Sequence, residues 1–136
     1  MTASTAEIYQ LRRMVAEPTT TRGWTDARLQ AYIEAYPLTD ALGRSPTRPN
    51  AATPTALEAN PYWTATYDLN AAAADIWDEK ASSLAENFDV GDYSRQQAYD
   101  NAVRRAKHFR ARRSPRPIEQ VPYPYPVRES WVGNTE

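Results

Sequence analysis

Cysteine is absent from the 136 residues, histidine occurs once and glycine four times. Without cysteine the chain has no disulfide framework, no thiolate metal site and no thiol nucleophile. One histidine, His108, cannot make a multi-histidine metal site, and four glycines argue against the glycine-rich loops that cradle phosphates. No metal site and no cofactor are therefore expected.

Long apolar runs are also absent. None approaches the roughly 18 to 20 residues that span a bilayer, so no membrane association is expected. The segment MTASTAEIYQLRRM lacks the apolar stretch of a secretory signal. These observations favour a soluble, intracellular protein.

Large aliphatic side chains are scarce. Leu, Ile, Val and Phe together number 19, whereas Ala alone numbers 22. A core built from such residues buries little apolar area, and burial stabilises by only about 25 cal/mol for each square ångström. The formal net charge of −1 does not force the chain open by self-repulsion. We expect one thin helical domain that gains stability from neighbouring copies.

Eleven prolines divide the chain. Pro18 stands alone, five prolines fall within 37–61, none occurs from 62 to 114, and five fall within 115–126. Because proline ends helices, helices are expected between these groups. Apolar residues at helical spacing, together with capping residues Ser4, Thr25, Asp68 and Ser94, predict four helices. They cover 5–17, a stretch from Thr25 to Pro37, 68–88 and 94–113.

The predicted fold is an all-α small bundle of about four helices, with a long Pro-rich loop and an extended C-terminal arm. Residues 1–113 form the helical domain, in which the two long helices pack antiparallel. Residues 37–66 show no sustained periodicity, and their long loop is assigned to 43–66. Residues 114–136 form the arm.

The arm alternates Tyr and Pro in VPYPYPV, which favours an extended, polyproline-like conformation. Such a segment is either a disordered tail or an arm that docks on another chain. Docking is favoured because several large apolar side chains follow Arg116: Ile118, Val121, Tyr123, Tyr125, Val127 and Trp131.

Charge is strongly segregated. Residues 95–116 carry eight basic groups and one acidic group, whereas residues 1–94 carry seven basic and 13 acidic groups. Three interpretations stay open for this basic block. The cations can simply complement the helix dipole, can match an acidic surface of a partner or of a neighbouring copy, or can contact phosphates. The net negative charge weighs against the third.

No catalytic constellation is evident, and an enzyme is not expected. Asp75, Asp78 and Glu79 lie close together on a predicted helix, where a paired-carboxylate or metal site is conceivable. A solvated helix face is the favoured interpretation for these acids. His108 is interpreted as a polar helix residue within a basic stretch.

Four segments follow one another in a characteristic order: EIYQLRRMVAEPTTT, TDARLQAYIEAYPLTDALGR, YDLNAAAADIWDEKASSLAENFD and YSRQQAYDNAVRRAKHFRARRSPR. Together they cover nearly all of 7–116 and resemble the small head-tail connector proteins of tailed bacteriophages, also called adaptor or head completion proteins. RRMVAEP, YDLNAAAADIW and RARRSPR carry most of the resemblance. The loop 43–63 is longer than this family type suggests, and the tail beyond Arg116 is the least typical part.

The resemblance implies a homo-oligomeric ring, usually of 12 copies, beneath the portal protein of the capsid. Such a ring extends the channel through which double-stranded DNA passes without sequence-specific binding, and it receives a tail stopper or tail-completion protein. The expected location is the capsid-tail junction of the virion, after assembly in the bacterial host cytoplasm. The alternative function is a small helical nucleic-acid-binding protein that uses the basic segment 95–116.

Two sets of residues follow from this resemblance. Contacts between copies are expected from the two long helices, at Ile76, Trp77, Leu84, Tyr99 and Val103. Portal binding is expected from the end of the last helix and the arm, at Arg110, Arg112, Arg113, Pro115, Arg116, Ile118, Val121, Tyr123, Tyr125 and Trp131. The opposite surface, with the loop 43–63, is expected to receive the next tail component.

Overall fold

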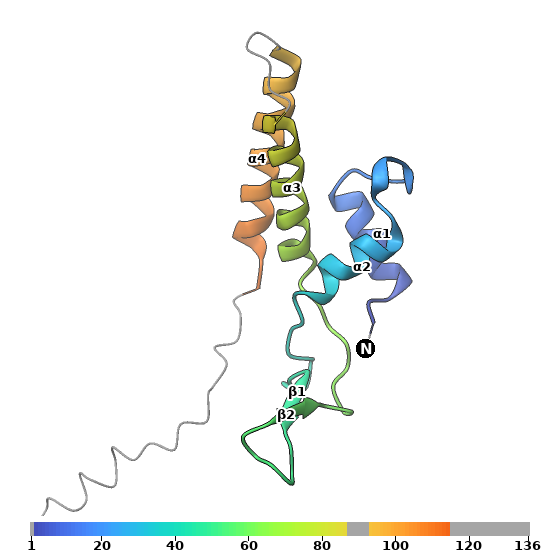
Figure 1. The fold of residues 1–136 in the computed structure, drawn as a ribbon, viewed down its shortest axis with the longest axis vertical. Helices are drawn as coiled ribbons and strands as arrows, with labels where there is room; N and C mark the ends of the chain where they lie inside the picture. The colour runs from blue at the N-terminus through green and yellow to red at the C-terminus, as the bar shows by residue number, and fades with distance from the viewer. Residues whose placement is uncertain (1, 87–92, 115–136) are drawn as a thin grey trace, which may run out of the picture.

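The computed structural model describes residues 2–86 and 93–114. Its elements are α1 (Thr5–Met14), a short 3-10 turn η1 (Thr21–Gly23), α2 (Asp26–Glu34), β1 (Thr47–Pro49), β2 (Leu57–Ala59), α3 (Leu69–Glu86) and α4 (Tyr93–Arg112). Figure 1 shows α3 and α4 as a long antiparallel hairpin, with α1 and α2 beside α3 and the two strands projecting below. The predicted small, predominantly helical domain is confirmed. The arm residues 115–136 lie outside the described residues.

Helix α1 begins with the predicted capping box. The Ser4 hydroxyl accepts a hydrogen bond from the Glu7 amide at 3.2 Å, and the Glu7 carboxylate accepts one from the Ser4 amide at 2.7 Å. The helix ends at Met14 rather than at residue 17, and Ala16 has a left-handed φ of 58°. The predicted C-terminal boundary of this helix was therefore wrong.

Tertiary contacts explain this early end. The Trp77 indole of α3 donates to the Met14 carbonyl at 3.2 Å, and the Lys80 ammonium donates to the Val15 carbonyl at 2.6 Å. Carbonyls at the end of a helix have no partner within it, so these donors satisfy them. The ammonium of Lys80 also pairs with Glu17, whose side chain is 9% exposed.

A buried arginine shapes the connection from α1 to α2. The Arg12 guanidinium donates to the carbonyls of Glu17, Thr19 and Trp24 at 2.9 to 3.1 Å and pairs with the Asp26 carboxylate. A buried guanidinium needs partners for its five N–H groups, and this connection supplies them. Arg12 therefore holds the whole turn from one side chain.

The core is small, as the composition predicts. Large side chains from α1, α2 and α3 are fully buried where these helices meet, namely Leu11, Val15, Leu29, Ile33 and Ile76. Between α3 and α4 the buried residues are mostly alanines, including Ala73, Ala81, Ala102 and Ala106. Alanine permits the two helix backbones to approach closely but buries little apolar area per residue.

Asp68 joins the beginning of α3 to the end of α4. One carboxylate oxygen accepts hydrogen bonds from the amides of Asn70 and Ala71, both at 3.1 Å. The other accepts one from the amide of Ser114 at 2.7 Å. The prediction that Asp68 caps this helix is confirmed. Its second role fixes the place where the chain leaves α4.

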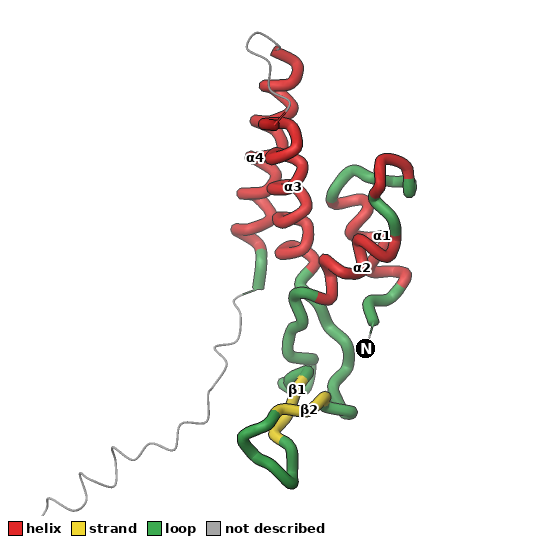
Figure 2. The backbone as a smooth tube through the Cα atoms, in the orientation of Figure 1, coloured by secondary structure: helices red, strands yellow, loops and turns green. Residues whose placement is uncertain are grey.

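Residues 37–66 are not an irregular loop throughout, so that prediction was wrong in part. Strands β1 and β2 pair antiparallel, with Arg48 opposite Glu58, and Figure 2 shows them partway along the segment, with the loop that joins them beyond. The Arg48 guanidinium and the Glu58 carboxylate form an ion pair at 2.8 Å, a cross-strand contact that stabilises such a pairing. Strands of three residues are too short for periodicity to reveal.

Residues 37–66, with β1 and β2, extend away from the helices and are called the projection below. Asp40 closes the base of this projection. Its carboxylate is 7% exposed and accepts hydrogen bonds from the amides of Leu42, Arg44 and Thr64, and from the Arg44 guanidinium. Burial alone raises the pKa of Asp40, but these donors outweigh it and lower the pKa from 3.8 to about 2. The ionised form therefore holds together two chain segments more than 20 residues apart.

Candidate interaction surfaces

Two of the five residues predicted to join copies lie inside the single chain. Ile76 is fully buried in the core and has no surface left for another copy, and Trp77 is 9% exposed. Leu84, Tyr99 and Val103 pack against the core and are partly exposed. Within the predicted set, the three partly exposed residues keep apolar surface at the edges of the α3–α4 pair.

Large apolar side chains are most exposed elsewhere. Tyr9, Leu42, Leu57 and Tyr62 are each more than 60% exposed, and the last three belong to the projection that carries β1 and β2. Periodicity does not reveal these residues, because strands of three residues are too short to show an exposed and a buried face in the sequence. Asn50 and Asn60, each of which accepts hydrogen bonds from amides two residues ahead, are the turn signals that could have located the projection.

Helix α4 presents a polar outer face. Ala102 and Ala106 are buried against α3, whereas Gln97, Asn101 and Arg104 are exposed on the other side of the helix. The same exposed side carries Lys107, His108 and Arg112. His108 contacts Phe109 edge-to-face at 5.2 Å, in agreement with its interpretation as a polar helix residue.

Arg105 and Arg110 of the basic block contact other parts of the chain. The Arg110 guanidinium pairs with the Asp78 carboxylate of α3, although both side chains stay nearly half exposed. The Arg105 guanidinium lies over the Trp77 ring, 4.9 Å from its centroid. These contacts fasten α4 to α3 and reduce the cationic surface of this segment.

The three acids of α3 do not form a bare solvated face, which corrects that interpretation. Asp75 accepts a hydrogen bond from the Tyr36 hydroxyl, Asp78 pairs with Arg110, and Glu79 pairs with Arg28. Each acid therefore links α3 to a different part of the chain. Within residues 2–86 and 93–114, no three side chains of His, Asp or Glu gather in a way that could hold a metal ion.

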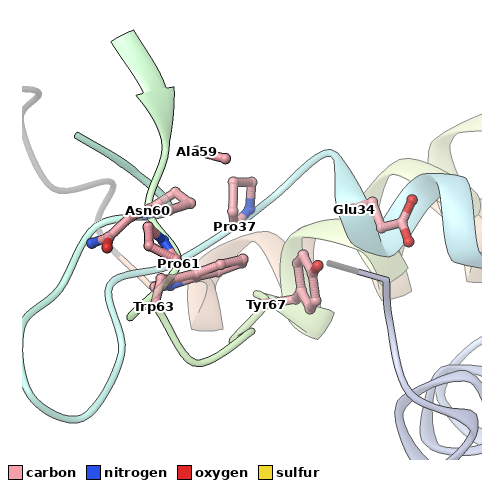
Figure 3. Close-up of a pocket in the computed structure, with 8 residues that line it drawn as sticks. Glu34, Pro37, Ala59, Asn60, Pro61, Trp63 and Tyr67 are labelled. Atoms are coloured by element: carbon pink, nitrogen blue, oxygen red, sulfur yellow. The ribbon is translucent and has the colours of Figure 1, made fainter. Parts of the chain in front are cut away.

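A shallow pocket of about 310 Å³ lies between the end of α2 and the projection (Figure 3). The Trp63 indole N–H donates to the Leu38 carbonyl at 2.9 Å, and the Glu34 carboxylate accepts from the Ala3 amide at 3.0 Å. Burial, and then the Glu34 and Glu7 carboxylates, raise the pKa of the Tyr67 hydroxyl. The pocket is lined by Glu34, Pro37, Pro46, Ala59, Asn60, Pro61, Trp63 and Tyr67.

The polar groups named in this pocket serve the fold. The Glu34 carboxylate also accepts from the Gln30 amide group, and the Trp63 ring meets the Tyr67 ring edge-on with centroids 5.8 Å apart. These groups tie the first residues of the chain and the base of the projection to α2. They form no arrangement of a nucleophile with a general base.

Of the predicted portal-binding residues, three are described. Arg112 and Arg113 are exposed at the end of α4, and Arg110 is exposed but paired. The other seven, Pro115, Arg116, Ile118, Val121, Tyr123, Tyr125 and Trp131, lie outside the described residues.

The projection and the end of α4 lie at the same end of the molecule. Ser114 is bound to Asp68, and the neighbouring Tyr67 pairs with Pro37 at the root of the projection. Figure 1 shows the projection below the helical body, at the end where α4 finishes. The sequence predicts that the loop 43–63 lies on the surface opposite the arm. The structure places this loop at the end of the body where α4 finishes and the arm begins, so the prediction is wrong for the start of the arm.

Among the described residues, no helix combines the length and the apolar character needed to cross a membrane. No family model matches the chain, and neither a curated protein nor a solved structure matches it. The resemblance to the connector family therefore stays a prediction that rests on the four quoted segments.

Proposed function

We propose that the chain is a structural head-tail connector protein of a tailed bacteriophage. Copies form a ring beneath the portal protein, extend the DNA channel and join the capsid to the tail. One observation supports this proposal most. In the α3–α4 hairpin, α1 and α2 pack against α3 only, and the outer face of α4 stays exposed along its length. A slender element of this kind, with a seam of alanines, suits a wall built from repeated copies.

Contacts between copies form at the edges of the hairpin. Tyr99 and Val103 lie four residues apart on α4 and, like Leu84 of α3, are partly exposed. In a ring, one face of each copy meets a different face of the next, and such contacts close when the rotation is right. We assign Leu84, Tyr99 and Val103 to the contact with the next copy. Trp77 is buried and contributes to this contact only by packing inside the chain.

The arm and the end of α4 bind the portal. Arg113 and Arg116 supply positive charge, and the apolar side chains beyond Arg116 supply the surface to be buried. One arm from each copy multiplies weak contacts into a stable joint through avidity. The projection begins at the same end of the body, so its exposed Leu42 and Leu57 are assigned to the same joint.

Truncation tests the portal contact. Removal of residues 115–136 is expected to leave the helicity measured by circular dichroism nearly unchanged, because the described helices end at Arg112 and Ser114 keeps its hydrogen bond to Asp68. Co-purification with the portal protein of the same phage should be abolished. Removal of residues 132–136 alone is the matched control and should retain binding, since it leaves Trp131 in place. Portal binding by the longer truncation would contradict the assignment of the arm.

The alternative is a small helical nucleic-acid-binding protein. Its supporting observation is the exposed cations of α4, and a salt titration separates the two functions. A dedicated binding module requires submicromolar, salt-sensitive affinity of the isolated subunit for duplex DNA. For the connector we expect affinity in the range of non-specific binding, with dissociation constants of about 10⁻⁶ M or weaker at physiological salt.

A further inference from the structure

The charges of the described chain are unevenly satisfied. Outside α4, five cationic side chains form ion pairs with carboxylates of the same chain, whereas Arg13, Arg22 and Arg113 are exposed and form none among the described residues. The five are Arg12, Arg28, Arg44, Arg48 and Lys80. On α4, Arg110 is paired and Arg105 lies on Trp77. Arg104, Lys107 and Arg112 are exposed, and none of them forms an ion pair within the part of the chain that the structure describes.

These three cations share one side of α4, which we call the α4 stripe. Arg104 and Lys107 are three residues apart and lie close in space, and Arg112, eight residues after Arg104, lies on the other flank of the same exposed half of the helix. Gln97 and Asn101 extend the same side with amide donors. The stripe faces away from Ala102 and Ala106, which are buried against α3. Asp100 is the one acidic residue among the described positions of this side.

The described part of a second copy offers few free carboxylates for this stripe. Most acids of the described chain are already engaged: six in ion pairs, Asp68 as a helix cap, Asp75 with Tyr36, Glu7 with Ser4, and Glu34 with Ala3 and Gln30. The stripe needs an anion that the described part of the fold does not supply. A row of exposed cations and amide donors on one helix face suits a row of phosphates.

We propose that the α4 stripe binds the phosphate backbone of duplex DNA. This inference deepens the proposed function, because it identifies α4 as the helix that faces the DNA channel. The placement of α4 at the channel rests on the proposed function. The contact between the stripe and phosphate is a property of the subunit by itself. It carries no sequence preference, since it touches no base edge.

Salt dependence is the readout. Three cations that each neutralise one phosphate give a slope of about −2.7 for log affinity against log salt. Between 50 mM and 200 mM salt, affinity should then fall about 40-fold. We would measure the binding of the full chain to a short fluorescent duplex by anisotropy across this range.

A matched pair of variants assigns the effect to the stripe. R104Q combined with K107Q should reduce the slope to about −0.9, because only Arg112 remains. R13Q combined with R22Q removes the same charge from exposed positions outside α4 and should keep the wild-type slope. Equal slopes for the two double variants, or no binding of the wild type at 50 mM salt, would overturn the inference.

The other partner class gives a different result. If R104Q with K107Q leaves DNA binding unchanged but abolishes self-association or portal binding, the stripe is a protein contact and the inference is wrong. The proposed function fails separately. Submicromolar DNA affinity that disappears in R104Q with K107Q would support DNA binding by the stripe but contradict the connector function. The truncation experiment with the portal protein tests the connector function alone.

Discussion

Two buried carboxylates have a large influence on this small fold, and each joins segments that are distant in sequence. Asp68 is 5% exposed and binds the amides of Asn70, Ala71 and Ser114. Asp40 is 7% exposed and binds donors from both sides of the projection. Buried charges of this kind are costly unless they are fully paired, so both positions are sensitive to substitution.

Replacing Asp68 tests the joint between α3 and α4. D68A removes a helix cap and leaves the Ser114 amide without its partner, and we expect a loss of about 2 to 3 kcal/mol in the free energy of unfolding. Urea unfolding measures this loss. D68S should recover part of the stability, because serine caps helices well, but should leave faster amide exchange at Ser114. D100A, at an exposed position of α4, is the control and should change stability by less than about 0.5 kcal/mol.

Asp40 makes stability depend on pH in the acid range. Because its pKa falls from 3.8 in the unfolded chain to about 2 in the folded chain, the ionised form stabilises folding at all pH values above about 4. This contribution is lost as the pH falls from about 4 to 2. The stability difference between the wild type and D40N, measured by urea unfolding, should therefore shrink over this range. A difference that stays constant from pH 5 to pH 2 would contradict the role of Asp40.

At the scale of elements, the α3–α4 pair depends on small side chains. Ala102 is 1% exposed and faces α3, whereas Ala111 is exposed on the same helix. A102L forces extra volume into the contact and should cost about 1 to 3 kcal/mol. A111L keeps a strong helix former in an open position and should change stability by less than about 0.5 kcal/mol. Thermal unfolding of the two variants at one concentration makes the comparison.

The helices were predictable from the sequence because their signals are local. Ser4, Thr25 and Asp68 cap helices as predicted. The end of α1 was not predictable, because Trp77 and Lys80 reach it from more than 60 residues away. The projection was missed for a similar reason, since Asp40 acts with Thr64 and Arg48 with Glu58 across the intervening chain.

The candidate surfaces follow the same division. The basic side of α4 could be read from sequence spacing alone. The pairing of Arg110 with Asp78 and the burial of Ile76 could not, because they depend on the rotation of α4 against α3 and on the helices that cover α3. Sequence locates charge and apolar residues on an element, and packing decides which of them stay exposed.

At the scale of the whole molecule, the limited core predicts that stability depends on association. The fully buried large side chains come from three helices, while α4 contributes mainly alanines to the core. We expect the melting temperature of the full chain to rise with protein concentration, because any assembly that binds only the folded chain stabilises it by mass action. Differential scanning calorimetry over a wide range of concentrations measures this. A melting temperature independent of concentration, with a monomer in sedimentation, would contradict assembly of the isolated chain.

The alanine seam also determines how wide the α3–α4 hairpin is. Helices that meet through alanine lie near the lower limit of about 8 Å between their axes, so the α3–α4 hairpin is narrow. In the proposed ring, the width of the hairpin limits how many copies fit around a channel of a given diameter. Bulkier residues at the seam would widen each sector, so the seam links side-chain volume to the stoichiometry and the diameter of the channel.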